Sequence, residues 1–462
     1  MGNFNQHIEN EMKLQEYLGL WFLPVDEEFK RNCRAGVVRF QPSRHSEVEI
    51  LGSFDDIESG AKLEAVFRRY PVVHGASHGR KRFTLFECTT CSRQIDAFED
   101  PELANTRIDF IDAWVGPNVF ASKFEVAFYE VSFGMGGLAA WHNVTAFSSE
   151  HDFKHKATCL RYQCPEDVLL YEDGKVVIPL SYSWHPATQQ VAQTSGTIEH
   201  DPRVVIKSRD GRLPFYGDEG AFEWYITRIR TVIGLMIGSA CPIYNCSGLF
   251  QKFAAPTETE GLKHEERFSR LWCRDINNDW VPSPFDIWIL FVAVKDELRQ
   301  VVSAFFRMAA VPAGYAGHLV FLYSSRTTAF TQGTLPELVY QFEGIHREVL
   351  GHKKWELTDR FKDILKEIRC VFPEFSDEEF DAIETYVRKR RNNYSHANPE
   401  TYHKNFRLYI FATMWMRMFD TITVLYLCGL SPRTIWGGLG KNHEYREMVS
   451  SLPSLLRTGE TC

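Results

Sequence analysis

The chain has 462 residues, a formal net charge of −8 and a hydrophobic content of 44%. This length suffices for two or three domains with large hydrophobic cores. The acidic balance excludes a uniformly basic nucleic-acid coat, so any site for a polyanion must be local. Eleven cysteines, without a basic-then-apolar signal pattern through Asn10, argue against a disulfide framework and indicate a cytoplasmic protein.

The sequence predicts neither a membrane span nor a cofactor. The most apolar segments, 231–241 and 421–430, are too short to cross a bilayer and are expected to be buried core. Cys88 and Cys91 form a single CxxC pair, and two looser cysteine pairs follow at 159/164 and 241/246. Two such pairs can combine into a zinc site, but the spacing is not that of a recognised zinc finger, so no metal is predicted and the question stays open.

The amino-terminal half has the pattern of a β-rich domain. Short alternating or β-branched runs are separated by turn residues, as at 36–40, 48–51, 82–86, 124–131 and 176–180. An Asp173-Gly174 turn precedes the last run. We predict a sandwich-like or barrel-like domain over residues 1–275. Its tryptophans include Trp21, Trp114, Trp141 and Trp184. They can form a surface on which sugars or bases stack, or they can be core residues, and the core role is favoured.

Helical signals begin near Gly220, where apolar residues follow helical spacing from Phe222 to Ile233, and they dominate from Pro284 onward. We predict helices over 285–309, after the capping-box pair Thr334 and Glu337, and from Leu357 to Ile368. The predicted fold is therefore α+β and multidomain, with an all-α helical bundle over residues 280–462 after the β-rich domain.

The next helix has the clearest start in the chain. Ser376 and Glu379 have the spacing of a capping box, and a stripe of apolar residues follows. The helix ends in the run Arg388-Lys389-Arg390-Arg391, and cations are favoured at a helix carboxyl end. A last helix, 402–427, is apolar nearly all round and must be central to the bundle or to a subunit interface, with Gly429 as its stop.

The chemistry is expected where these two helices meet. Arg391 and His396 are offset by about 140° around a helix axis, whereas Asn392 and His396 share a face. A guanidinium holds phosphate through forked donors, and an imidazole transfers protons near neutral pH. The same arginine-to-histidine spacing occurs at 69/74 and 347/352, so spacing alone does not establish a site.

Arg-Asn-x-x-x-His at the entry to the last long helix resembles the HEPN superfamily of metal-independent ribonucleases. Residues 338–347 look like the first core helix of its Apea-like branch, and the ending at 427–430 is also similar. In the amino-terminal half, 19–24, 36–42 and 48–54 resemble the β-rich domain of ApeA-type anti-phage proteins.

This resemblance implies an abortive-infection effector. The first domain would sense a phage-derived trigger or hold the enzyme off. Paired HEPN domains of a homodimer, or of a higher homo-oligomer, would cut cellular RNA, with tRNA a favoured class. The ribose 2′-hydroxyl would attack the adjacent phosphate, with His396 transferring protons, Arg391 stabilising the phosphorane and Asn392 orienting either group.

Four further residues are candidates for the site, and each also has a simpler structural explanation. Glu343 can position an arginine or be an ordinary surface acid. Tyr394 can stack on a base or pack at the helix joint. Arg388 and Arg390 can bind flanking phosphates of the RNA, or they can simply be solvent-exposed cations at the end of a helix.

Two other readings of the whole chain stay open. The HEPN region can be a non-catalytic module that binds RNA or a partner protein, with Arg391 and His396 in a structural polar network. A carbohydrate-binding or lytic enzyme can also be built on the β-rich half, although no paired carboxylates stand out there.

Overall fold

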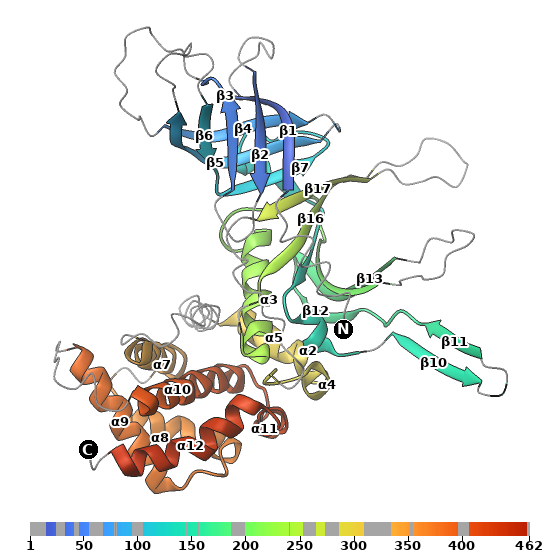
Figure 1. The fold of residues 1–462 in the computed structure, drawn as a ribbon. Helices are drawn as coiled ribbons and strands as arrows, with labels where there is room; N and C mark the ends of the chain where they lie inside the picture. Colours follow the sequence, from blue (N-terminus) through green and yellow to red (C-terminus); the bar gives the residue numbers. More distant parts are fainter. Residues whose placement is uncertain are drawn as a thin grey trace.

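The structure is a computed structural model. It describes residues 15–24, 33–40, 46–54, 68–77, 79, 81–94, 105–144, 146–152, 154, 157–185, 199–239, 241–252, 265–272, 286–308, 334–351, 354–395 and 406–459. A small barrel occupies one end of the molecule, a helical bundle occupies the other, and a curved sheet lies between them (Figure 1).

The first six strands close into an antiparallel barrel. They are β1 (Gln15–Phe22), β2 (Arg34–Phe40), β3 (Glu47–Leu51), β4 (Arg69–Ser77), β5 (Arg82–Gln94) and β6 (Asn105–Asp109). Closure results because β5 pairs with both β4 and β6. Trp21, Val38 and Phe83 fill the interior, and a Cβ at Gly75 would lie 2.2 Å from the Trp21 ring. Of the two predicted β architectures, this part is the barrel.

The sheet continues from the barrel through β5. Residues 82–86 of β5 pair with β7, whereas 89–94 pair with β6, and Glu87 between them has a φ of +54°. Beyond β5 the order is β7, β17, β16, β9, β14, β13 and β12, all antiparallel neighbours. Their bounds are β7 (Asp112–Gly116), β9 (Glu130–Met135), β12 (Val168–Glu172), β13 (Val176–His185), β14 (Glu199–Ser208), β16 (Ile243–Lys252) and β17 (Glu265–Trp272).

The prediction of one strand over 124–131 is wrong. A 3₁₀ turn η2 (Lys123–Glu125) and a two-residue strand β8 (Ala127–Phe128) come first, and β9 begins only at Glu130. The chain changes partners at Tyr129, whose N–H donates to Leu249 O and whose carbonyl accepts from Ser208 N, both at 2.9 Å. β8 instead pairs with β15 (Leu213–Pro214). A separate hairpin joins β10 (Phe147–Asp152) and β11 (Ala157–Tyr162).

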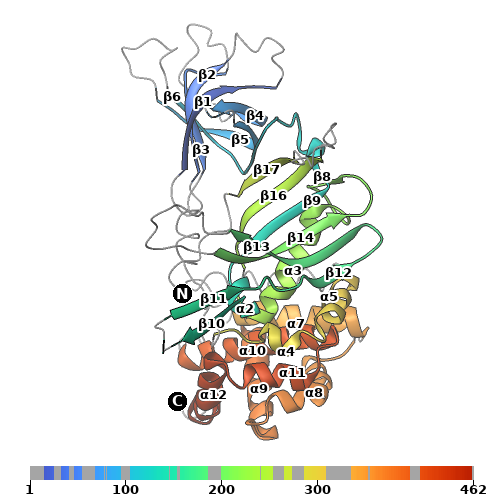
Figure 2. The same ribbon diagram turned by 90° about the vertical axis from the view of Figure 1, so that its right-hand side faces the viewer.

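Helix α3 (Phe222–Ile237) connects the sheet to the bundle. Its apolar stripe is buried, as the spacing predicts, and it ends at Gly238 with a φ of +80° beside Trp288. Figure 2 shows α3 alongside the sheet, with the bundle beyond it. The short helix α2 (Leu138–His142) lies at the same end. One hydrophobic core runs from the sheet through α3 into the bundle.

The bundle consists of α4 (Phe291–Val294), α5 (Leu298–Arg307), α7 (Thr334–Leu350), α8 (Leu357–Ile368), η3 (Arg369–Val371), α9 (Asp377–Ser395), α10 (Phe406–Leu427), α11 (Pro432–Leu439) and α12 (His443–Gly459). The prediction of one helix over 285–309 is wrong. The Ile289 N–H donates to Met236 O at 2.9 Å, and the Trp141 indole donates to Ile289 O at 2.9 Å. These contacts hold this stretch outside a helix, so α4 starts only at Phe291.

Helix α10 is central to the bundle. Among the described residues it is the one helix long and apolar enough to cross a membrane, yet 83% of its most apolar window is buried inside the protein. It ends in a Schellman motif, with Gly429 N donating to Tyr426 O at 2.8 Å and Leu430 N donating to Leu425 O at 3.0 Å. Gly429 has a φ of +91°, so it is the stop that the sequence predicts.

Candidate functional site

Helix α9 carries the predicted site residues to its carboxyl end. Its start is the predicted capping box: Glu379 N donates to the Ser376 hydroxyl at 3.2 Å, and Ser376 N donates to the Glu379 carboxylate at 2.9 Å. Phe380, Ile383 and Val387 are buried and fix the rotation of the helix against its neighbours. The rotation in turn determines where the side chains that follow Val387 point.

Arg391 is fixed by an acid from another helix. Its Nη2 donates to both carboxylate oxygens of Glu343 on α7, at 3.0 and 3.3 Å. Its Nη1 donates to Asn392 Oδ1 at 3.2 Å, and its guanidinium lies 5.1 Å from the ring centroid of Tyr340. Glu343 therefore positions the predicted catalytic arginine. Tyr340 was missed, although its three-residue offset from Glu343 places both on one face of α7.

The other cations at this end have local partners. Arg388 Nε donates to Glu384 at 3.0 Å, one turn earlier on α9. Glu384 also accepts from the Thr358 hydroxyl of α8 at 2.7 Å. Arg390 Nε donates to the Tyr386 hydroxyl at 3.1 Å. These contacts hold Arg388 and Arg390 to residues one turn earlier on α9, whereas Arg391 is held by α7.

Tyr394 is 41% exposed, which suits either of its predicted roles. His396 lies outside the described residues, so the distance from its imidazole to Arg391 and Asn392 stays a prediction. His352 of the second spacing match also lies outside them. His74 of the first match is a core residue: its Nε2 lies 2.9 Å from Phe120 O, and burial lowers its pKa below the usual value.

A second polar cluster next to the candidate site is structural. His346 on α7 is fully buried, with Nδ1 at 3.1 Å from Arg360 Nη1 and Nε2 at 3.1 Å from Asp363. Because Arg360 can only donate, Nδ1 is the acceptor, and Nε2 carries the proton shared with Asp363. This tautomer ties α7 to α8 and keeps the α7 face that bears Glu343 in place.

The Cys88 and Cys91 side chains lie in different surroundings. Cys88 lies in the barrel core, whereas Cys91 is exposed and its thiol donates to Arg107 O at 3.3 Å, so the two do not face one site. Partial desolvation of its sulfur, together with the neighbouring Asp109, raises the pKa of Cys91 to about 11, which favours its neutral thiol. Within the described part of the chain, no group of three or more metal-type side chains lies together.

Residues 16–298 match the model of the family ApeA N-terminal domain 1. The matched region covers more than half of the chain and contains the barrel, the sheet and α3. The chain belongs to the ApeA family. No curated protein and no solved structure matches it.

The ApeA match confirms the family resemblance of the amino-terminal half and supports a role in anti-phage defence. It ends at the first residue of α5, so it does not cover α7 to α12. The HEPN assignment of residues 280–462, and the boundary near residue 275, therefore stay predictions. In this ApeA-type chain the candidate site lies wholly outside the matched region.

Proposed function

We propose that this ApeA-type protein is a cytoplasmic anti-phage effector whose helical bundle is an endoribonuclease of HEPN type. It would cut cellular RNA, with tRNA the favoured class, once a phage-derived trigger acts on the amino-terminal region. The observation that supports this most is the ion pair of Glu343 and Arg391, which pre-positions the arginine of the Arg-Asn-x-x-x-His motif.

The proposed reaction is transesterification within the RNA. The ribose 2′-hydroxyl attacks the adjacent phosphorus, the bond to the 5′-oxygen breaks, and a 2′,3′-cyclic phosphate remains. His396 moves a proton from the nucleophile or to the leaving oxygen, and Arg391 stabilises the extra negative charge of the phosphorane. Asn392, in contact with Arg391 at 3.2 Å, orients the guanidinium or the phosphate. These steps use only protein side chains.

The surroundings of Arg391 suit an RNA backbone. Three further cations, Arg388, Lys389 and Arg390, precede it on α9. Glu343 and Glu384 each hold one arginine through the ion pairs described, so two of the four charges at this helix end are balanced by these acids. We propose that two such helix ends face each other in a homodimer and form one cleft for RNA.

Helix α3 is the proposed route from trigger to nuclease. In its first turn Glu223 lies 3.3 Å from Nη2 of Arg270 on β17. At its other end Met236 O accepts from Ile289 N at 2.9 Å, next to the bundle. A shift of the sheet against α3 would therefore displace the segment on which the bundle packs.

RNA from phage-challenged bacteria tests the proposal. Wild type should yield discrete fragments with cyclic-phosphate ends, and His396→Ala should reduce them about 100-fold or more. His443→Ala, a change at an exposed histidine of the same bundle, is the matched control and should cut normally. Protection that persists in His396→Ala without RNA fragments would overturn the nuclease assignment.

The same ion pair also suits a second function, a non-catalytic HEPN module that binds RNA or a protein. In that case Arg391 and Glu343 are a structural pair. Arg391→Ala then weakens binding without any cleavage to lose, whereas a nuclease loses cleavage and keeps binding within a few fold. Arg433→Ala, an exposed arginine of α11, is the control for both measurements.

A further inference from the structure

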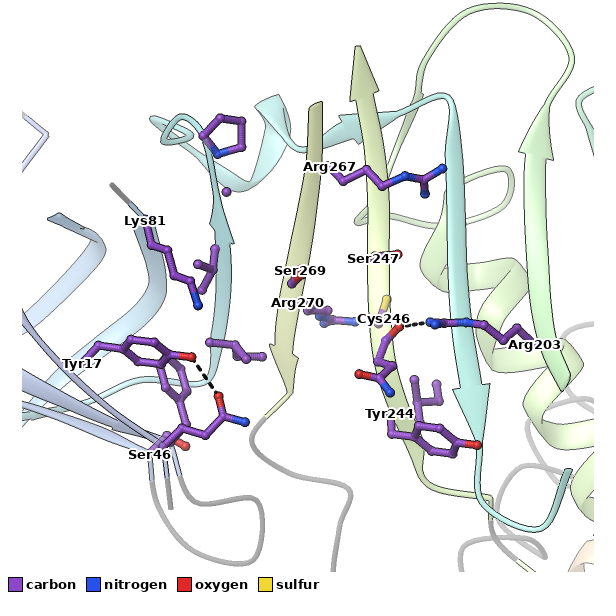
Figure 3. A pocket seen from close by; sticks show the side chains of 18 residues that line it. Tyr17, Ser46, Lys81, Arg203, Tyr244, Cys246, Ser247, Arg267, Ser269 and Arg270 are labelled. Carbon is purple, nitrogen blue, oxygen red and sulfur yellow. Dashed lines mark hydrogen bonds between the residues drawn. The ribbon is translucent and has the colours of Figure 1, made fainter. Parts of the chain in front are cut away.

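A cavity of about 630 Å³ lies at the junction between the barrel and the curved sheet. Figure 3 shows Tyr17 and Lys81 on its barrel side and Arg203, Tyr244 and Arg267 on its sheet side. The volume is within the range of about 300–1,000 Å³ that is typical of pockets for small molecules. In Figure 1 the barrel and the strands β7, β16 and β17, which line the cavity, are separated from α9 by the rest of the sheet and α3.

The charge of the cavity is opposite to that of the whole chain. Lys81, Arg203, Arg267 and Arg270 line it, and no described Asp or Glu does, although the chain has a net charge of −8. Arg270 is paired with Asp112 at 2.7 Å, and Arg267 reaches across β16 to Glu130 on β9, at 3.4 Å. A cavity of this kind attracts an anion.

One wall of the cavity is shaped by an irregularity in β16. The pairing of β16 with β9 shifts between Tyr244 and Ser247, and Asn245 has a φ of +50°. This bulge directs the carbonyl of Asn245 toward Arg203, whose Nη2 donates to it. Arg203 Nε is buried and has no hydrogen-bond partner in the structure. Bulges re-aim side chains next to binding sites, and an arginine with an unused donor has capacity for a ligand oxygen.

The cavity also offers aromatic rings and hydroxyl groups. Tyr17 on the barrel side and Tyr244 on the sheet side contribute rings to its lining, and Ser247 and Ser269 line it as well. The Tyr244 hydroxyl donates to Asp201 at 3.2 Å, which fixes its ring. A ligand with one flat ring and one phosphate uses both kinds of group, because guanidinium groups fit phosphate and tyrosine rings stack on bases.

We infer that this cavity is a binding site for a phosphorylated nucleoside, with Lys81, Arg203 and Arg267 on the phosphate and a tyrosine ring on the base. The inference does not rest on the nuclease proposal, because binding can be measured on a cleavage-deficient chain such as His396→Ala. The inference assigns phosphorylated nucleosides as ligands to the region that matches the ApeA family.

Titration calorimetry on the full chain tests the inference, with the four ribonucleoside triphosphates, their monophosphates, adenosine and inorganic phosphate as probes. At least one nucleotide should bind with a Kd below about 1 mM, and more tightly than adenosine or phosphate. Raising the salt from about 50 to about 300 mM should weaken binding. A Kd above about 1 mM for every nucleotide would overturn the inference.

A pair of double variants separates the cavity from the general surface. Lys81→Met with Arg267→Gln should weaken nucleotide binding roughly tenfold or more, since charge-assisted hydrogen bonds are lost. Lys207→Met with Arg161→Gln is the matched control, because Lys207 is exposed and Arg161 also contacts a cross-strand glutamate, at 3.3 Å. Thermal melting shows that both variants are folded. Equal binding by both, or tighter binding of a hexaglutamate peptide than of any nucleotide, would contradict the assignment.

Discussion

Arg391 and Glu343 are 48 positions apart in the sequence, yet Nη2 of the arginine lies 3.0 and 3.3 Å from the two carboxylate oxygens. The pair joins α9 to α7 at the point where the motif residues leave α9. The Arg391 side chain is 31% exposed and that of Glu343 is 19% exposed, so the pair is accessible to a ligand but partly shielded from water. Such a pair fixes direction more than it adds stability.

Replacing Glu343 by Gln tests this positioning role. The amide loses the charge that holds the guanidinium, so RNA cleavage should fall roughly 10- to 100-fold with little change in thermal stability. Glu348→Gln is the control, because Glu348 is on the same helix and contacts the exposed Arg347 at 3.2 Å. Equal cleavage by the two variants and the wild type would show that Glu343 does not position the arginine.

The ion pair of Asp112 and Arg270 should be essential for stability. Both side chains are at most 6% exposed, and they join β7 to β17 at 2.7 Å. Arg270→Met leaves a buried carboxylate uncompensated, and the free energy of unfolding in urea should drop by about 3–5 kcal/mol. The pair of Arg267 and Glu130, whose side chains are 41% and 18% exposed, is the comparison, and Arg267→Met should cost at most about 1 kcal/mol. Similar losses for both would contradict the buried-charge explanation.

Asp420 on α10 should make the protein less stable as the pH rises. It is fully buried, both carboxylate oxygens lack a hydrogen-bond partner, and burial raises its pKa well above the usual 3.8. The folded state therefore holds a proton that the unfolded state releases above about pH 4. The contribution of this group to the free energy of unfolding is therefore fully present below about pH 4. It decreases by at most about 1.4 kcal/mol per pH unit as the pH rises to the raised pKa of the folded state.

The variant Asp420→Asn removes this proton exchange. Urea denaturation at several pH values measures the free energy of unfolding of this variant and of wild type. The difference, variant minus wild type, should increase as the pH rises above about 4. Asp377→Asn is a control at a carboxylate that is 91% exposed. A wild-type and Asp420→Asn difference that is constant with pH would mean that Asp420 is ionised in the folded protein.

Two glycines near the end of α10 should respond to alanine in opposite directions. Gly429 has a φ of +91°, so Gly429→Ala should cost about 1–2 kcal/mol of unfolding free energy. Gly437 lies inside α11 with no atom near its missing Cβ, and Gly437→Ala should stabilise by about 0.5–1 kcal/mol. Thermal melts of the two single variants compare them directly, and a stabilised Gly429→Ala would refute the role of the Schellman motif.

Local signals were sufficient for several parts of this protein. The capping box of Ser376 and Glu379, the stop at Gly429 and the buried stripe of α3 were all predictable, because the atoms involved lie within one or two turns of each other. The strands predicted at 36–40 and 48–51 were predictable for the same reason, and they are β2 and β3. The α+β order, β-rich region first and helices afterwards, follows from these periodicities.

Most of the elements, their order, the motif residues and the family resemblance of the first half could thus be predicted from the residues alone. Long-range packing was needed to show that β5 closes a barrel and also continues into a sheet, that the helix expected over 285–309 starts only at Phe291 and divides into α4 and α5, and that Glu343 holds Arg391. It alone gathers Lys81, Arg203 and Arg267 around one cavity. These features depend on contacts between residues tens to hundreds of positions apart, and such contacts form only when the packed core brings distant segments together.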